Sequence, residues 1–298
     1  MLKEVTEYLN CQPGRIYVDG TVGSGGHARA ILEKSAPTGR LIGLDWDEEA
    51  IQRAQENLSV FGVRVNLFPK NFKDLTAVLK SLSIEKVDGI LIDLGISTEQ
   101  LEDPRRGFSF RWDGPLDMRM SRETKMTAQD LLRRYSESEL REILWQYGEE
   151  RWGKRISRAI VRQRQTRPIR TTRGLAEVIE KSVPSYRGRI HPATRTFQAL
   201  RISVNEELSN LEAFLGQCKT LLNPGGRLSV ISFHSLEDRI VKNYFRQWAK
   251  GEKNNSPLFR LLTPKPVVPS SEEVLSNPKA RSAKLRAAER LSMNVEGG

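Results

Sequence analysis

The chain has 298 residues, enough for two domains or for one domain carrying a large insertion. Its apolar and charged fractions, 38% and 29%, are typical of a globular protein. No apolar run reaches the ~18 residues of a membrane span, and the N-terminus lacks the apolar core of a signal peptide. Cys11 and Cys218 have no metal-binding spacing. We therefore expect a cytoplasmic protein with two reduced thiols, no membrane segment and no metal ion.

The net charge of +11 is concentrated in the middle third of the chain. Residues 104–200 contain 22 Lys and Arg against 11 Asp and Glu, whereas the rest of the chain is balanced. A solubility effect would be spread over the whole surface. A basic field this localised instead suggests a polyanionic partner that is bound by one module.

The first hundred residues alternate strand and helix patterns. Strands are predicted at 15–19, 40–44, 63–68 and 87–93, and helices at 26–35, 47–58 and 74–82. The fourth strand is apolar enough to be buried on both faces. This alternation predicts a parallel sheet with helices on both sides.

The alternation then stops and later resumes. A loop rich in Gly and Pro is predicted at 95–122, followed by helices at 127–134, 136–147, 151–165 and 172–182. Capping boxes begin at Thr127 and Ser136. The sheet pattern returns with a helix at 201–222, a turn at 223–226, a strand at 227–232, a helix at 235–248, a mobile loop at 264–278 and closing strands at 259–263 and 282–288.

These patterns predict an α/β fold interrupted by a helical insertion. Residues 1–103 are expected to form the first part of the core and residues 201–298 the second part. Residues 104–200, which carry the excess positive charge, are expected to form an inserted basic helical domain that binds the polyanionic partner.

A glycine-rich segment from Asp19 to His27, DGTVGSGGH, follows the first strand and opens a helix. Glycines let the backbone turn sharply and approach a ligand, while the free N–H groups of the helix present donors. A tight structural turn would have the same composition. Asp45, at the end of the second strand, favours a ligand because an acid there bonds ribose hydroxyls. Asp45 could instead cap the following helix, a role that Asp47 could also fill.

The glycine spacing favours S-adenosylmethionine over a nicotinamide cofactor. The segment reads Asp-x-x-x-Gly-x-Gly-Gly, which suits methyltransferases better than the G-x-G-x-x-G of dinucleotide enzymes. A Pro-Gly-Gly turn at Pro224 precedes the fifth strand, as in class I methyltransferases. Ligands in such sheets bind at the carboxyl ends of the strands. That places the glycine segment, Asp45, Phe72 and Asp93 around one crevice, with Phe72 either an adenine-stacking wall or a plain core aromatic.

Five segments together make the sequence resemble one family. They are DGTVGSGGH from Asp19, LIDLGIS from Leu91, RGFSF from Arg106 with DGPLDMRM from Asp113, HPATRTFQALR from His191 and SFHSLEDR from Ser232. On these motifs the chain resembles the RsmH (MraW) family of bacterial methyltransferases, which modify the exocyclic N4 of a specific cytosine in the decoding region of 16S rRNA. The resemblance extends over nearly the whole chain.

The resemblance implies a class I (Rossmann-like) S-adenosylmethionine methyltransferase core with an inserted all-helical domain. It implies cofactor contacts at Gly25, Gly26, His27, Asp45, Phe72, Asp93 and Gln100. It also implies 16S rRNA, or the 30S subunit that contains it, as the partner. One departure is the absence of a short His-x-Pro-Val-like segment before the helix expected from Leu2. If that segment helps to cover the active site in the family, its absence would affect activity.

Asp93 is the expected catalytic residue. A cytosine amino nitrogen is a poor nucleophile because its lone pair is delocalised, so the transfer needs in-line placement and acceptors for the N–H groups. Amino-methyltransferases often place an Asn/Asp-Pro-Pro-aromatic motif at the end of the fourth strand, where this chain has Asp93-Leu94-Gly95-Ile96-Ser97. Asp93, with the Leu94 carbonyl, would accept those hydrogen bonds or anchor the amino end of the cofactor. The alternative is an Asp that only caps the loop.

A basic helix is expected to bind the RNA. The stretch from Arg151 to Arg173 has nine basic residues and no acidic one. The arginines expected along one face of this helix, and so along an RNA backbone, are Arg151, Arg155, Arg158 and Arg162. A solvated face is the alternative. Cations and aromatics also alternate on the long loop at Arg105, Arg106, Phe108, Phe110 and Trp112, either to stack on an unpaired base or to form a local core.

Other functions and roles stay open at this point. A DNA amino-methyltransferase is disfavoured by the missing Pro-Pro-aromatic motif, and a dehydrogenase by the glycine spacing. A non-catalytic RNA-binding assembly factor would keep the fold without turnover. His191 and His234 are expected to line the active site or to be loop hydrogen-bond partners. The sequence leaves the oligomeric state, monomer or homodimer, undecided.

Overall fold

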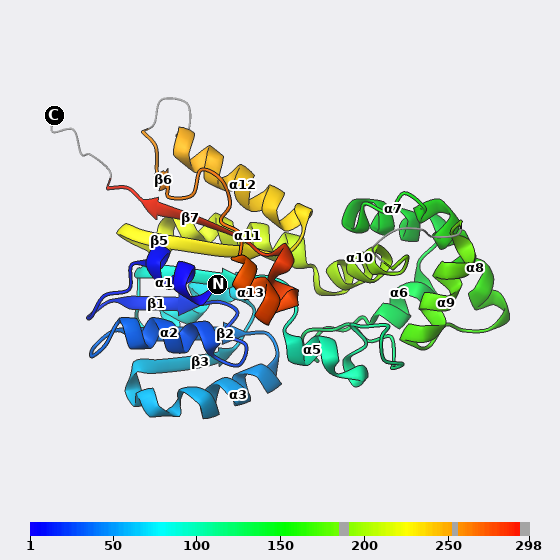
Figure 1. Cartoon of the computed structure of the whole chain (residues 1–298), viewed down its shortest axis with the longest axis horizontal. Helices are drawn as coiled ribbons and strands as arrows, with labels where there is room; N and C mark the ends of the chain where they lie inside the picture. The colour runs from blue at the N-terminus through cyan, green and yellow to red at the C-terminus, as the bar shows by residue number, and fades with distance from the viewer. Residues whose placement is uncertain (185–190, 252–255, 293–298) are drawn as a thin grey trace. The chain divides into compact units, whose positions relative to one another are not determined.

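The computed structural model describes residues 1–184, 191–251 and 256–292. It divides into two compact units (Figure 1). The sheet unit comprises 1–95 and 208–298, and the helical unit comprises 96–207. The insertion was expected at 104–200, but the helical unit is longer at both ends and extends from residue 96 to residue 207. Ile96, Leu101 and Val204 pack into the helical core, so both flanking segments belong to that unit.

The sheet unit contains one seven-stranded sheet in the order β3-β2-β1-β4-β5-β7-β6. Its strands are β1 (Ile16–Asp19), β2 (Arg40–Asp45), β3 (Val65–Pro69), β4 (Val87–Asp93), β5 (Leu222–Ser232), β6 (Phe259–Leu261) and β7 (Lys284–Arg290). The first five strands are parallel, as the alternating pattern predicted, and β7 and β6 are antiparallel. The order reverses between β1 and β4, and in sheets of this kind ligands bind beyond the carboxyl ends of the strands at such a reversal.

Helices cover both faces of this sheet. They are α1 (Leu2–Leu9), α2 (Gly26–Lys34), α3 (Glu48–Leu58), α4 (Leu75–Ser81), α11 (Glu207–Leu221), α12 (Ser235–Lys250) and α13 (Ser271–Ser276), with 3-10 turns at Ser59–Arg64, Phe72–Asp74 and Pro278–Ser282. Side chains of α1, α2 and α3 pack with Tyr17 and Leu91 in one core, and those of α4, α11 and α12 pack with Val18 and Ile92 in the other. Successive strand residues face opposite cores, so the central strands β1 and β4 are buried on both sides.

Four local predictions were wrong. The loop expected at 95–122 contains α5 (Thr98–Glu102), which the Ser97 side chain caps, and a 3-10 turn at Pro104–Arg106. The helix expected at 201–222 is two helices, because Glu206 adopts a left-handed conformation (φ 50°) between α10 (Thr194–Asn205) and α11. The turn expected at 223–226 lies inside β5, where a register irregularity accommodates Gly225 at φ 77°. The loop expected at 264–278 contains α13, whose first turn is capped by the Ser270 side chain.

The helical unit has a core of its own. Its helices are α5 (Thr98–Glu102), α6 (Ala128–Arg134), α7 (Glu137–Gly148), α8 (Gly153–Thr166), α9 (Thr172–Ser182) and α10 (Thr194–Asn205), with a 3-10 turn at Pro104–Arg106. The capping boxes predicted at Thr127 and Ser136 are confirmed at the starts of α6 and α7. Buried side chains from α6 to α10 form one continuous cluster, which explains why this segment stands as a separate unit.

No helix among the described residues is both long and apolar enough to cross a membrane.

Candidate active site and RNA-binding face

The glycine segment between β1 and α2 forms a tight loop with an open side. Gly23 and Gly25 have positive φ angles of 54° and 93°, which side chains other than glycine rarely adopt. A Cβ atom added at Gly25 would press against the Leu58 side chain at 3.1 Å, so the loop is packed on that side. A Cβ atom added at Gly26 would meet no heavy atom within 4 Å. The first turn of α2 therefore faces open space, as a ligand cradle requires.

Asp45 connects the end of β2 to this loop. Its Oδ2 accepts a hydrogen bond from the Gly23 N–H at 2.9 Å, and its Oδ1 accepts one from the Asp47 N–H at 2.9 Å. Asp47, not Asp45, caps α3, because its side chain accepts from the Glu49 N–H. The capping alternative for Asp45 is therefore excluded. Burial raises the pKa of Asp45 to about 6, against the effect of these two backbone donors.

His27 and Asp93 form a half-buried pair beside the loop. His27 Nε2 lies 3.6 Å from Asp93 Oδ2. The other side-chain atoms of the pair, His27 Nδ1 and Asp93 Oδ1, are buried and have no hydrogen-bond partner among the described residues. Burial lowers the pKa of His27, but the Asp93 carboxylate and the charge of Asp19 outweigh it, so the pKa is raised. The Asp93 side chain therefore does not cap the loop, and it offers a free acceptor.

Asp19 lies beside this pair, although it was not among the residues predicted for the site. Its side chain is 1% exposed; Oδ1 accepts the Thr21 N–H at 3.1 Å, while Oδ2 has no partner within the described chain. Burial raises the pKa of Asp19 to about 7, which nearby His27 partly offsets. The only signal in the sequence was the position of Asp19 as the last residue of a buried strand, directly before the glycines.

Phe72 borders the loop and also packs against the core. Its Cβ lies 3.1 Å from the position that a Cβ on Gly20 would take. Its ring meets Phe214 edge to face, with 5.6 Å between centroids. Phe72 thus has one side in the core and is only partly buried. The two roles considered for it, core aromatic and ligand wall, are compatible.

Gln100 belongs to the helical unit, where it is buried in the first turn of α5. Its Oε1 accepts the Ser97 N–H at 3.1 Å and completes a capping box with the Ser97 hydroxyl. Contact between Gln100 and a cofactor stays a prediction.

The four arginines predicted to share one helix face are in different environments. Arg151 precedes α8, which begins at Gly153 rather than at 151. The Arg151 and Arg155 guanidinium groups lie 5.3 and 5.1 Å from the centre of the Trp152 ring. Arg158 Nε lies 3.6 Å from Glu137 Oε1. Arg162 is exposed and lines a cavity at the other end of the helix. All four side chains are on the surface, as an RNA contact requires.

The aromatic residues of the long loop mostly form a local core. Phe108 is 6% exposed within the helical core, and Phe110 stacks on His191 at 4.4 Å between centroids. The Arg106 guanidinium donates to the backbone carbonyls of Arg119 and Met120. Trp112 is different, because 57% of it is exposed. Of this set, only Trp112 is available for stacking on a base.

His191 and His234 both have structural partners. His191 Nε2 lies 2.8 Å from Glu180 Oε1, and its Nδ1 accepts the Ala193 N–H at 3.2 Å. His234 caps α12, accepting the Glu237 N–H at Nδ1 over 3.4 Å. These contacts favour the hydrogen-bonding role for both side chains.

Comparison with known proteins agrees with this geometry. Residues 1–291 match the sequence model of the MraW methylase family. A relative from Geotalea uraniireducens named "Ribosomal RNA small subunit methyltransferase H" is 50% identical over 98% of this chain and 97% of its own. A relative of the same name from Syntrophotalea carbinolica is 52% identical over 98% of this chain and 96% of its own.

Solved structures with a similar chain path include a putative rRNA methylase from Clostridium thermocellum. It is 11% identical, with a TM-score of 0.46 over 97% of this chain and 95% of that one. The putative methyltransferase SMU.1697c from Streptococcus mutans, solved with SAH, is 12% identical, with a TM-score of 0.46 and the same coverage. From the family match over residues 1–291 and the near full-length relatives at about half identity, the chain belongs to the MraW methylase family.

Proposed function

We propose that this chain transfers the methyl group of S-adenosylmethionine to the exocyclic N4 of a specific cytosine in the decoding region of 16S rRNA, in the cytoplasm. Two relatives that are half identical over nearly their full length are named for methylation of small-subunit ribosomal RNA. The geometric observation that carries the proposal is the His27–Asp93 pair beside the open glycine loop.

The residues of the loop fit this cofactor. Gly26 leaves space for a ligand against the first turn of α2. Asp19 Oδ2, a buried carboxylate oxygen without a partner among the described residues, suits a positively charged ligand, because an unpaired buried acceptor is costly. Asp45 would accept ribose hydroxyls with the remaining lone pairs of its oxygens, and Phe72 would cover an adenine ring. The family resemblance adds Gly25, His27 and Gln100 as contacts. The cofactor, when bound, supplies an electrophilic methyl group on a sulfonium.

Asp93 has the chemistry that the target amine needs. The Asp93 carboxylate, on a side chain that is 30% exposed, can take a hydrogen bond from the N4 amino group, which draws the lone pair of that group out of the ring and directs it at the methyl group. The amine loses one proton when the new C–N bond forms, and the same carboxylate can take that proton. His27, whose pKa is raised, holds the Asp93 side chain through Oδ2.

The helical unit would hold the RNA. We assign phosphate contacts to Arg151, Arg155, Arg158 and Arg162, whose side chains are exposed on or beside α8. Arginine pairs with phosphate through its planar fork of donors, and such contacts set position without reading sequence. The target cytosine must leave any stack to reach the methyl donor, so base flipping is expected.

One assay tests the proposal. Labelled methyl transfer from S-adenosylmethionine is measured on 30S subunits, free 16S rRNA and duplex DNA, followed by nucleoside analysis. We expect N4-methylcytidine in 30S subunits or in 16S rRNA, and the comparison identifies which form is the substrate. Label on DNA alone would make the protein a DNA amino-methyltransferase. Cofactor binding without transfer to any of the three would make it a non-catalytic RNA-binding factor.

A further inference from the structure

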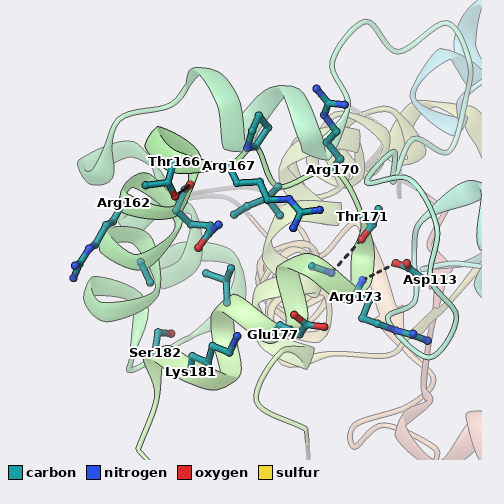
Figure 2. A pocket seen from close by; sticks show the side chains of 16 residues that line it. Asp113, Arg162, Thr166, Arg167, Arg170, Thr171, Arg173, Glu177, Lys181 and Ser182 are labelled. Atoms are coloured by element: carbon teal, nitrogen blue, oxygen red, sulfur yellow. Dashed lines mark hydrogen bonds between the residues drawn. The ribbon is translucent and has the colours of Figure 1, made fainter.

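A large cavity lies within the helical unit, between the C-terminal half of α8 and helix α9 (Figure 2). Its volume of about 990 Å³ is at the upper end of the range for ligand sites. The segment 166–171, which joins the two helices, forms part of its wall. Nothing in the proposed chemistry of the sheet unit uses this cavity.

Five basic side chains line the cavity: Arg162, Arg167, Arg170, Arg173 and Lys181. All five residues are exposed, and none has a side-chain hydrogen bond or ion pair among the described residues. Figure 2 shows that they come from both helices and from the joining segment. Arg164 of the same helix contrasts with them, because its guanidinium donates to the carbonyls of Leu132 and Tyr135. The five cations therefore have no role in holding the fold together.

The two acidic residues of the lining offset only part of this positive charge. Asp113 Oδ1 accepts the backbone N–H of Arg173 at 3.2 Å, and Glu177 has no ion-pair partner within the described residues. Asp113 thus fastens the start of α9 to the long loop. The cavity keeps a net charge of +3 from its lining residues.

The N-terminus of α9 is not the anion site itself. The N–H of Thr172 donates to the Gly114 carbonyl, that of Arg173 to Asp113, and that of Gly174 to the Thr171 hydroxyl. With these backbone donors occupied, an anion must be held by the arginine and lysine side chains. Such donors, spread over two helices and a loop, suit several phosphates in a row better than one enclosed anion.

The cavity also has apolar walls. Ile169, which is 7% exposed, lines it together with Ala159 of α8 and Val178 of α9. A lining that combines apolar side chains with cations matches a single strand, whose bases and riboses are apolar on their faces and whose phosphates lie outside.

We propose that this cavity binds consecutive phosphates of a single-stranded RNA segment. The proposal rests on the proposed function, which makes RNA the partner, and deepens it. It extends the phosphate-binding surface from Arg162 to Arg167, Arg170, Arg173 and Lys181. Binding a polyanion here releases counterions from the RNA, so affinity depends steeply on salt.

The test compares two triple variants with equal loss of charge. Arg167→Gln/Arg170→Gln/Arg173→Gln removes three cations from the cavity. Lys125→Gln/Arg141→Gln/Lys154→Gln removes three exposed cations of the same unit that lie outside it. Dissociation constants for an unstructured oligouridylate of about 16 nucleotides are measured over a range of salt concentrations. Circular dichroism, thermal melting and S-adenosylmethionine binding verify that both variants are folded.

The slope of log K for RNA association against log salt concentration should be smaller in magnitude by about 2 in the cavity variant. Three contacts are removed, and each single-strand phosphate contact contributes about 0.7 to this slope. The control variant should lose less than half as much. Equal slopes for the wild type and the cavity variant would overturn the proposal, as would equal losses in both variants or no salt-dependent RNA binding by the wild type. Methyl transfer by the wild type to 30S subunits or 16S rRNA is measured in parallel. If methyl transfer is observed but the salt slopes do not differ as expected, the proposed function stands and only the proposal of RNA binding in the cavity is rejected.

Discussion

His27 Nε2 and Asp93 Oδ2 lie 3.6 Å apart, although His27 lies in the first turn of α2 and Asp93 is the last residue of β4. This contact orients the Asp93 carboxylate so that one oxygen is paired and the other is free. The pairing fixes the position of the Asp93 carboxylate, which is the hydrogen-bond acceptor proposed for the target amine.

Asp93→Ala is expected to lower the single-turnover rate of methyl transfer by roughly 10²–10⁴-fold at saturating cofactor, the usual range for loss of an acid–base group. Asp93→Asn keeps the shape and should recover only a small part of the rate. Asp88→Asn is the control on the same strand, since Asp88 binds Arg15 and the Ile16 N–H and has a structural role. It should lower stability and leave the single-turnover rate unchanged. A wild-type rate in Asp93→Ala would refute the role of Asp93.

The two adjacent glycines of the loop should respond differently to alanine. Gly26→Ala adds a methyl group that meets no other heavy atom within 4 Å. Gly26 is a helical residue, and alanine is favoured over glycine inside a helix by about 0.5–1 kcal/mol, so the melting temperature should hold or rise. The added methyl group would occupy the ligand space, so we expect S-adenosylmethionine to bind at least about tenfold more weakly. Calorimetric titration and thermal melting measure the two effects.

Gly25→Ala is the matched comparison. Its φ of 93° and the Leu58 side chain at 3.1 Å both oppose a Cβ, so this variant should lose about 1–2 kcal/mol of stability. A Gly26→Ala protein that binds the cofactor as tightly as the wild type would show that the open side of the loop is not the ligand side.

Phe72→Leu is expected to weaken S-adenosylmethionine binding roughly three- to tenfold, because an aromatic stacking partner contributes about 0.5–1.5 kcal/mol beyond burial. Phe214→Leu removes the other member of the same edge-to-face pair and serves as the control. Both variants lose the ring contact, so both should lose stability. If cofactor affinity falls equally in both, Phe72 acts through the core and not as a wall.

The stability of the ligand-free protein should fall as pH rises from about 4 to about 7. Burial raises the pKa of Asp19 from 3.8 to about 7, so over this window the folded state keeps a proton that the unfolded state has lost. Raising the pH removes that proton against the cost of burial, and folding becomes less favourable. Asp45, whose pKa is raised to about 6, acts in the same direction. Denaturant unfolding at a series of pH values measures the effect.

Asp19→Asn should flatten this pH dependence without abolishing it, because Asp45 still titrates. The raised pKa of His27 adds a contribution of the same sign, since stability from a protonated histidine is lost as pH rises through its folded pKa. Identical pH profiles in the wild type and in Asp19→Asn would mean that Asp19 does not hold a proton in the folded protein.

Features that depend on a few neighbouring residues could be predicted from the sequence. The strands and helices of the first hundred residues, the glycine loop and the capping boxes at Thr127 and Ser136 all follow from periodicity and from side chains that reach three residues along the chain. The break at Glu206 escaped prediction because the hydrophobic pattern of α10 continues into α11, and a single left-handed residue leaves little trace in it.

The grouping of side chains from distant segments was decided by the tertiary structure. Parallel pairing of β1 with β4 brings Asp19 opposite Leu91, and so brings Asp19 near Asp93. The packing of α8 against α9 gathers Arg162, Arg173 and Lys181 around one cavity, whereas the helix-face pattern had grouped Arg162 with the arginines before it. The sequence by itself determined the cofactor loop and the basic helical insertion, because local conformation and composition are written in neighbouring residues. Strand register determined that the Asp19 and Asp93 carboxylates interact electrostatically. Helix packing determined which arginines line the same cavity. Neither follows from neighbouring residues.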